Sequence, residues 1–198
     1  MNSPRLILAS TSIYRRALLE RLRLPFEVFA PDVDETALPA EPPAHTALRL
    51  ADLKAEAAAP ATGRPVLIIG SDQVAVLDAQ PLGKPGDHLS AVRQLQAMRG
   101  KSVVFNTAIC LFNPATGRKQ LENVPTTVWF RDYSDDQIEH YLRTEQPYDC
   151  AGSAKIEGMG IALVERIDST DPTALIGLPL MRLTTMLKNE GIEVIPRS

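Results

Sequence analysis

The sequence has no strong charge excess, few aromatic residues and few cysteines. Its 198 residues carry a formal net charge of −3, and aromatic residues make up 5% of the chain. Without a basic excess, we expect no binding of polymeric nucleic acid, which relies on clustered lysine and arginine. The two cysteines, Cys110 and Cys150, form no CxxC pair, so we expect reduced, buried thiols.

Long apolar runs are also absent. No segment approaches the roughly 18 apolar residues of a membrane-spanning helix, and the first residues lack the apolar stretch of a secretory signal. We therefore expect a soluble, cytoplasmic protein without a membrane partner. The length suits one domain, residues 1–198, which can bury a full hydrophobic core.

Several common catalytic and phosphate-binding motifs are missing. The chain has no GxxxxGK[ST] loop, no GxGxxG after a strand and no GxSxG elbow. Its three histidines are scattered, without a pair at metal-ligand spacing. An enzyme built from this chain would therefore rely on carboxylates and cations.

The pattern of apolar residues alternates between strand-like runs and helical spacing. Strands are predicted at 5–9, 26–29, 103–112, 121–130 and 161–167, with an irregular strand at 150–160, and helices at 13–23, 44–59, 89–98, 134–143 and 179–189. Strands and helices interleave, and two hairpins are expected. The fold class is therefore α/β, with a mixed sheet.

The segment "LASTSIYRRALLERL", residues 8–22, places two arginines at the start of a predicted helix. A helix N-terminus favours anions, so Arg15 and Arg16 beside its free N–H groups suggest that a phosphate binds there. Alternatively, Arg16 and Glu20 lie four residues apart and form an ordinary solvated face. The segment alone favours neither interpretation.

Asp72 lies in "VLIIGSDQVAVLD", between two apolar, strand-like runs. A carboxylate there is expected to be partly buried, which requires a cation, a metal or several hydrogen-bond donors. Alternatively, residues 70–73 form the turn of a tight hairpin. On this segment alone, the hairpin is favoured.

Other candidate residues are unremarkable one by one. Lys54, Lys84 and Glu35 fit solvated helix or loop positions, and Tyr14 fits a core aromatic residue. Glu157 lies in the glycine-rich "SAKIEGMG", which suits either close approach of a ligand or a simple bend between strands.

Taken in order, these segments resemble the Maf family of nucleoside triphosphate pyrophosphatases. The matching motifs are "LASTSIYRRALL", "VDET", "RLADLKA", "IIGSDQVAVLD", "LGKP", "CAGSAKIEGMGI" and "LIGLPL". The resemblance implies hydrolysis between the α- and β-phosphates of a nucleoside triphosphate, with a divalent cation, Mg²⁺ or Mn²⁺. It also implies a two-lobed single domain around an elongated mixed sheet with flanking helices, a cleft between the lobes, and a homodimer.

The resemblance assigns roles to the candidate residues. Asp72 is the general base that activates water, and Glu35 and Asp72 hold the metal through carboxylate oxygens. The substrate phosphates are bound by Ser10, Arg15, Arg16, Lys54 and Lys84.

Three further positions, Tyr14, Gln73 and Glu157, resemble the branch of the family that hydrolyses 7-methyl-GTP. One carboxylate at Glu157 can accept both the N1–H and the exocyclic amine of guanine. Methylation at N7 makes the base cationic, which favours stacking on Tyr14. The alternatives are a dTTP and UTP pyrophosphatase of the same family and a non-catalytic, nucleotide-binding regulator of cell division.

Overall fold

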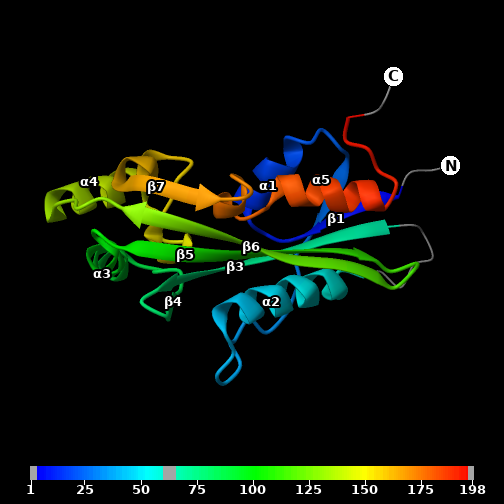
Figure 1. Cartoon of the computed structure of the whole chain (residues 1–198), viewed down its shortest axis with the longest axis horizontal. Coiled ribbons are helices and arrows are strands. Elements are labelled where there is room, and N and C mark those ends of the chain that lie inside the picture. Colours follow the sequence, from blue (N-terminus) through cyan, green and yellow to red (C-terminus); the bar gives the residue numbers. More distant parts are fainter. Residues whose placement is uncertain (1–3, 60–65, 196–198) are drawn as a thin grey trace. The chain divides into compact units, whose positions relative to one another are not determined.

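Helices and strands interleave along the chain, as the sequence predicts (Figure 1). The computed structural model describes residues 4–59 and 66–195. The strands are β1 (Arg5–Ala9), β2 (Phe26–Phe29), β3 (Val66–Leu77), β4 (Gln80–Leu82), β5 (Ser102–Asn113), β6 (Arg118–Phe130) and β7 (Val164–Ser169). The α-helices are α1 (Ile13–Glu20), α2 (Pro43–Ala57), α3 (His88–Met98), α4 (Asp135–Glu145) and α5 (Leu180–Asn189).

The strands form one mixed sheet, which confirms the predicted fold class. Its order is β2-β1-β3-β5-β6-β7, and β4 pairs with β3. Strand β1 is parallel to both β2 and β3, whereas β4 runs antiparallel to β3 and β7 antiparallel to β6. Strands β5 and β6 are neighbours joined by a short turn, the hairpin that the sequence predicts.

The chain divides into two compact units. The first unit consists of residues 1–72, 107–124 and 171–198, and the second of residues 73–106 and 125–170. In the first unit, helices α1 and α5 cover one face of the strands and α2 covers the other (Figure 1). Leucines of β1, α1 and α5 form the centre of a buried apolar cluster on the first of these faces.

In the second unit, α3 and α4 pack against each other and against two short 3₁₀ helices, η1 (Ala151–Ser153) and η2 (Met159–Leu163). Helix α4 begins with a capping box, in which Ser134 and Gln137 each accept a hydrogen bond from the other's backbone N–H. The sequence signal for this helix start is therefore confirmed.

Three local predictions were wrong. Residues 70–73 form no hairpin turn, because β3 continues through them as a single strand of 12 residues. Residues 150–160 form 3₁₀ helix and turn rather than irregular strand, because positive φ angles at Gly152 and Ser153 break the extended backbone. Of the two thiols expected to be buried, Cys110 is buried, which raises its pKa to about 12, but Cys150 is only half-buried.

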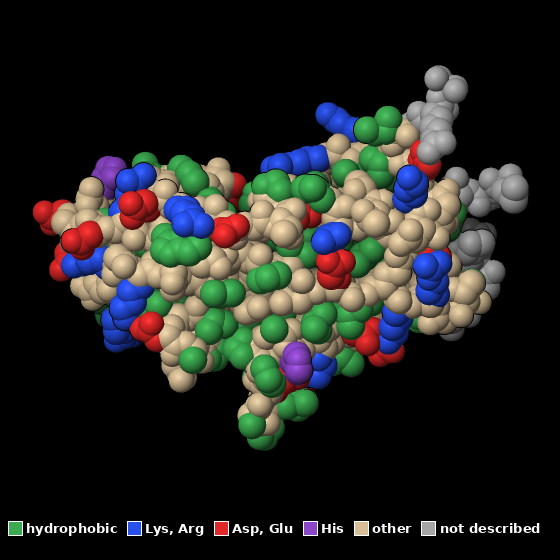
Figure 2. Space-filling model, viewed as in Figure 1, with side chains coloured by type: hydrophobic (Ala, Val, Ile, Leu, Met, Phe, Trp, Pro, Cys, Tyr) green, Lys and Arg blue, Asp and Glu red, His purple; other side chains and the backbone are tan. Residues whose placement is uncertain are grey.

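The surface in view carries acidic and basic side chains that are interspersed rather than segregated (Figure 2). Across residues 4–59 and 66–195, no helix combines the length and the apolar character that crossing a bilayer requires.

Candidate functional site

Lys54 lies at the centre of a partly buried charge cluster in the first unit. The ammonium Nζ of Lys54 lies 2.7 Å from Oδ1 of Asp72 and 2.6 Å from Oε1 of Glu35. The side chains of Lys54 and Asp72 are 6% and 11% exposed, whereas that of Glu35 is 59% exposed. The structure therefore brings together three predicted site residues from a helix, a strand and a loop.

Gly70 explains how Lys54 reaches Asp72. A Cβ atom added at Gly70 would lie 2.1 Å from the carbonyl oxygen of Ala51 and 2.8 Å from the backbone nitrogen of Ala55, both in α2. A side chain at this position would force α2 away from β3. The glycine lets the helix approach the strand closely, so the lysine of that helix meets a carboxylate two residues further along the strand.

The neighbouring residue Ser71 points to the other face of β3, since side chains alternate along a strand. Its buried hydroxyl is within hydrogen-bond distance of two carbonyl oxygens, 2.8 Å from that of Ala108 and 2.9 Å from that of Gly177. Arg15 donates to the same Gly177 oxygen through Nε, at 2.9 Å. One carbonyl group thus connects the strand that carries Asp72 to the arginine of α1.

Arg15 and Arg16 have different environments. Besides Gly177, Arg15 contacts Ser10, whose buried hydroxyl lies 3.4 Å from its Nη1 atom. Burial lowers the pKa of Arg15, and the carboxylates of Asp72 and Glu35 oppose that shift. Arg16 is exposed and pairs with Glu20 at 3.0 Å. The residues are adjacent in sequence but project about 100° apart around the helix.

The loop that carries Glu35 is fixed to α2 by Glu41. Its two carboxylate oxygens accept hydrogen bonds from Nε and Nη2 of Arg49, at 2.7 and 2.8 Å. Hydrogen bonding to Arg49 lowers the pKa of Glu41 to about 2. Arg49 also donates to the carbonyl oxygen of Thr36, next to Glu35. This bidentate pair therefore helps to define the position of the loop.

Tyr14 lies in α1 of the first unit and is half-buried, whereas the other three predicted residues belong to the second unit. Gln73 follows Asp72 in β3, Lys84 is exposed in the loop between β4 and α3, and Glu157 is exposed in the turn between η1 and η2. Gly160 in η2 is required because an added Cβ atom would lie 2.4 Å from the backbone carbonyl oxygen of Lys155. At Gly158 an added Cβ atom would meet only the Glu145 carboxylate, which can move aside.

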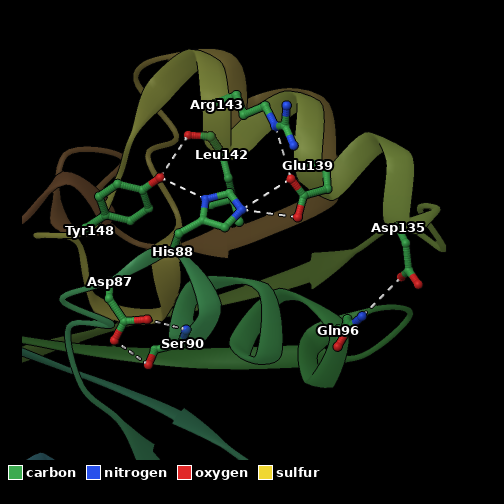
Figure 3. Close-up of polar contacts among 9 residues, drawn as sticks. All are labelled: Asp87, His88, Ser90, Gln96, Asp135, Glu139, Leu142, Arg143 and Tyr148. Atoms are coloured by element: carbon green, nitrogen blue, oxygen red, sulfur yellow. Dashed lines mark hydrogen bonds and ion pairs between the residues drawn. The ribbon is translucent and has the colours of Figure 1, made fainter.

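A further polar cluster holds α3 to α4 in the second unit (Figure 3). The His88 ring lies between Tyr148, whose hydroxyl is 3.0 Å from Nδ1, and Glu139, whose Oε1 is 3.1 Å from Nε2. Arg143 donates to the same carboxylate. The His88 contact lowers the pKa of Glu139. The four side chains thus form a chain of contacts from Tyr148 through His88 and Glu139 to Arg143, and the sequence motifs assign none of them to the predicted site.

The carboxylates of the first unit fit a hard divalent cation. Mg²⁺ and Mn²⁺ prefer carboxylate oxygens, and Mg²⁺ commonly uses one or two protein carboxylates together with substrate phosphates. Asp72 and Glu35 supply two such oxygens around one point. Among the described residues, no cluster of three or more His, Cys, Asp or Glu side chains forms a complete metal cage.

Sequence reasoning missed the residues that support this site. Asp171 is fully buried and accepts hydrogen bonds from the backbone N–H groups of Met181 and Arg182 at the start of α5. It also accepts from the backbone and hydroxyl of Thr173, so it orders the loop that presents Gly177. No local signal identifies Asp171, because α5 begins at Leu180 with Pro179 at the N-cap position, and Asp171 reaches the helix start only through the fold of the loop.

Comparisons with known proteins identify the same family as the sequence motifs. A family model described as Maf-like protein matches residues 5–190. A protein of Thiobacillus denitrificans named 7-methyl-GTP pyrophosphatase is 62% identical over 193 residues, which cover 98% of this chain and 96% of the relative. Proteins of Cupriavidus metallidurans and Ralstonia nicotianae with the same name are 58% and 59% identical, covering 95% and 94% of this chain and 94% and 95% of the relatives.

A solved structure of a nucleoside-triphosphatase, or dITP/XTP pyrophosphatase, from Mycobacterium abscessus is a distant match. It is 14% identical, covers 94% of this chain and 96% of its own, and has a TM-score of 0.41. The family model also matches almost the whole length, and the relatives do so at about 60% identity. The chain belongs to the Maf-like protein family.

Proposed function

We propose that the protein is a pyrophosphatase that hydrolyses 7-methyl-GTP to 7-methyl-GMP and diphosphate. The observation that carries this proposal is the name shared by relatives that are 58–62% identical over nearly the full length. The chemistry of the first unit supports it, because a buried carboxylate lies there beside cationic side chains suited to phosphate.

In this proposal, Asp72 is the general base. It accepts a proton from a water molecule whose oxygen attacks the α-phosphorus, and the bond from that phosphorus to the oxygen bridging to the β-phosphate breaks. Lys54 donates to Oδ1 of Asp72 and so orients the carboxylate. The diphosphate leaves with the bridging oxygen.

The phosphate chain is bound by cations and hydroxyl groups. Arg15 and Ser10 form one half-buried contact in the first unit, and Arg16, Lys54 and Lys84 complete the proposed set. A guanidinium can donate two parallel hydrogen bonds to phosphate oxygens, whereas an ammonium acts as a point charge.

The proposal includes a divalent cation, Mg²⁺ or Mn²⁺, held by Asp72 and Glu35. When bound, it would neutralise charge on the phosphates as the anhydride bond breaks. The donor set supports this assignment, since both side chains offer a carboxylate oxygen at the same point.

Base selection is assigned to Tyr14, Gln73 and Glu157. The Glu157 carboxylate would accept the N1–H and exocyclic amine of guanine, and Tyr14 would stack on the methylated, cationic base. Glu157 is exposed, so its carboxylate is accessible to a ligand.

The test is diphosphate release from 7-methyl-GTP, GTP, dTTP and UTP, with Mg²⁺ and with Mn²⁺. We expect turnover of 7-methyl-GTP to exceed that of the other three. A preference for dTTP or UTP would leave the chemistry in place and overturn the roles of Tyr14 and Glu157. Binding of 7-methyl-GTP without turnover with either metal would favour a nucleotide-binding regulator, including one of cell division.

The family resemblance further implies a cytoplasmic homodimer. The molar mass in solution tests the homodimer. A monomeric mass at micromolar concentration would contradict the dimer.

A further inference from the structure

We propose that the ammonium of Lys54 and the divalent cation compete for the same two carboxylate oxygens, so that the cation must displace Lys54 to bind. Lys54 then acts as a positioning residue as well as a phosphate ligand. This inference rests on the proposed function for the presence of the cation. It goes further by assigning Lys54 two alternative positions.

The distances carry the argument. Nζ of Lys54 lies 2.7 Å from Oδ1 of Asp72 and 2.6 Å from Oε1 of Glu35. Mg²⁺ binds oxygens at about 2.0–2.1 Å. A cation that contacts these two oxygens from the side on which the ammonium lies would overlap the ammonium nitrogen, so both cannot be there together.

Burial makes the competition strong. The Lys54 side chain is 6% exposed and that of Asp72 is 11% exposed, so water screens their charges poorly. Unpaired, the Asp72 carboxylate would be costly to bury, and the ammonium offsets that cost. The same ammonium repels any second cation that approaches the pair.

The exchange explains how Lys54 can both pair with Asp72 and bind a substrate phosphate. A lysine side chain has a flexible four-carbon stem, so its ammonium can move without movement of the helix. A triphosphate that arrives with the cation brings the negative charge that a displaced ammonium requires. Cation binding and nucleotide binding should therefore strengthen each other.

The chain provides a matched control at Lys119. Its Nζ lies 2.6 Å from Oδ1 of Asp52 and 2.6 Å from Oε1 of Glu56. This arrangement has the same chemical composition as the Lys54 cluster, but the Lys119 side chain is 30% exposed. No motif assigns Lys119 to catalysis or binding.

The experiment measures Mn²⁺ binding to the nucleotide-free protein, by the electron paramagnetic resonance signal of free Mn²⁺. We expect Lys54→Met to lower the dissociation constant by about tenfold or more, because the repelling charge is removed. Lys54→Arg keeps a cation and should bind Mn²⁺ as weakly as the wild type. Lys119→Met should leave the dissociation constant unchanged.

Two further variants keep the test decisive. Lys54→Gln is uncharged but keeps an N–H donor for Asp72, and it replaces Lys54→Met if that variant does not fold. Adding Asp72→Asn to either neutral variant should abolish the gain in affinity, which locates the Mn²⁺ ion at the carboxylate pair.

Equal Mn²⁺ affinity of the wild type and the neutral Lys54 variants would overturn the competition. An equal gain in Mn²⁺ affinity in Lys119→Met would overturn the competition too, because any carboxylate pair without its lysine would then bind the ion. Since no nucleotide is present, these outcomes are independent of the substrate. A gain in affinity in a protein that hydrolyses no nucleotide would support the exchange and contradict the proposed function.

Discussion

Two lysines of the first unit each lie between two carboxylates, at nearly equal distances. Lys54 lies 2.6 and 2.7 Å from its partners, and Lys119 lies 2.6 Å from both of its own. Both glutamates are exposed, but the lysine and the aspartate differ in burial: Asp72 is 11% exposed and Asp52 is 28% exposed. Contact distance alone therefore does not distinguish a candidate site from an ordinary surface ion pair.

The contribution of an ion pair to stability depends on how deeply the pair is buried. An exposed pair contributes little to stability and needs no special explanation. A buried charge cluster is costly to desolvate, and packed apolar residues would often be as stable. The buried Lys54–Asp72 pair is therefore better explained by chemistry than by stability.

The largest expected difference between the two clusters is in catalysis. Asp72→Asn should lower turnover of 7-methyl-GTP by roughly 10²–10⁴-fold, since a general base typically contributes that much. Asp52→Asn should leave turnover nearly unchanged. The measurement is steady-state diphosphate release, with circular dichroism as a check on folding. Full activity of folded Asp72→Asn would rule out its role as the base.

The next difference is in stability. Lys54→Met leaves a buried carboxylate without its cation and should lower the free energy of unfolding by about 3 kcal/mol. Lys119→Met breaks a more exposed cluster and should cost about 1 kcal/mol or less. Urea denaturation of both variants and the wild type measures these losses. Equal losses would mean that burial does not separate the two clusters.

Gly70 tests how the buried cluster is assembled. Gly70→Ala places a methyl group against the backbone of α2 and should destabilise the protein by about 2–3 kcal/mol. Gly83→Ala is the control, because a Cβ atom there meets no described atom within 4 Å. Thermal unfolding of both variants provides the comparison, and a neutral Gly70→Ala would show that α2 can shift freely.

The smallest expected effect is the loss, at acid pH, of the stability that the Glu41–Arg49 pair contributes. The pKa of Glu41 is lowered to about 2 in the folded state, from an ordinary value of 4.5. Its contribution to stability is therefore present above pH 4.5 and is lost as the pH falls towards 2. Glu41→Gln should lose less stability than the wild type over this range, as measured by urea denaturation at several pH values. Identical pH profiles would contradict the lowered pKa.

The elements show where sequence reasoning succeeds. The helix at 134–143 was predicted from its cap and first-turn acids, and the structure has α4 at Asp135–Glu145 with Ser134 as the cap. Such signals are local, since neighbouring residues make the contacts. The prediction of a hairpin at residues 70–73 was wrong because Gly70 is needed for close packing against α2 and not for a turn. That helix lies about 20 residues earlier in the chain, so no local pattern indicates the contact.

The sequence alone determined the α/β class, most element positions and the family, since these depend on local periodicity and on ordered motifs. The family resemblance then singled out Lys54, Asp72 and Glu35, of which Lys54 and Glu35 are unremarkable one by one. Only the tertiary structure decided that one ammonium lies between both carboxylates, and that the Gly177 carbonyl connects Arg15 to β3. The reason is physical: burial and long-range contacts arise from packing between distant segments, and no local pattern encodes those distances.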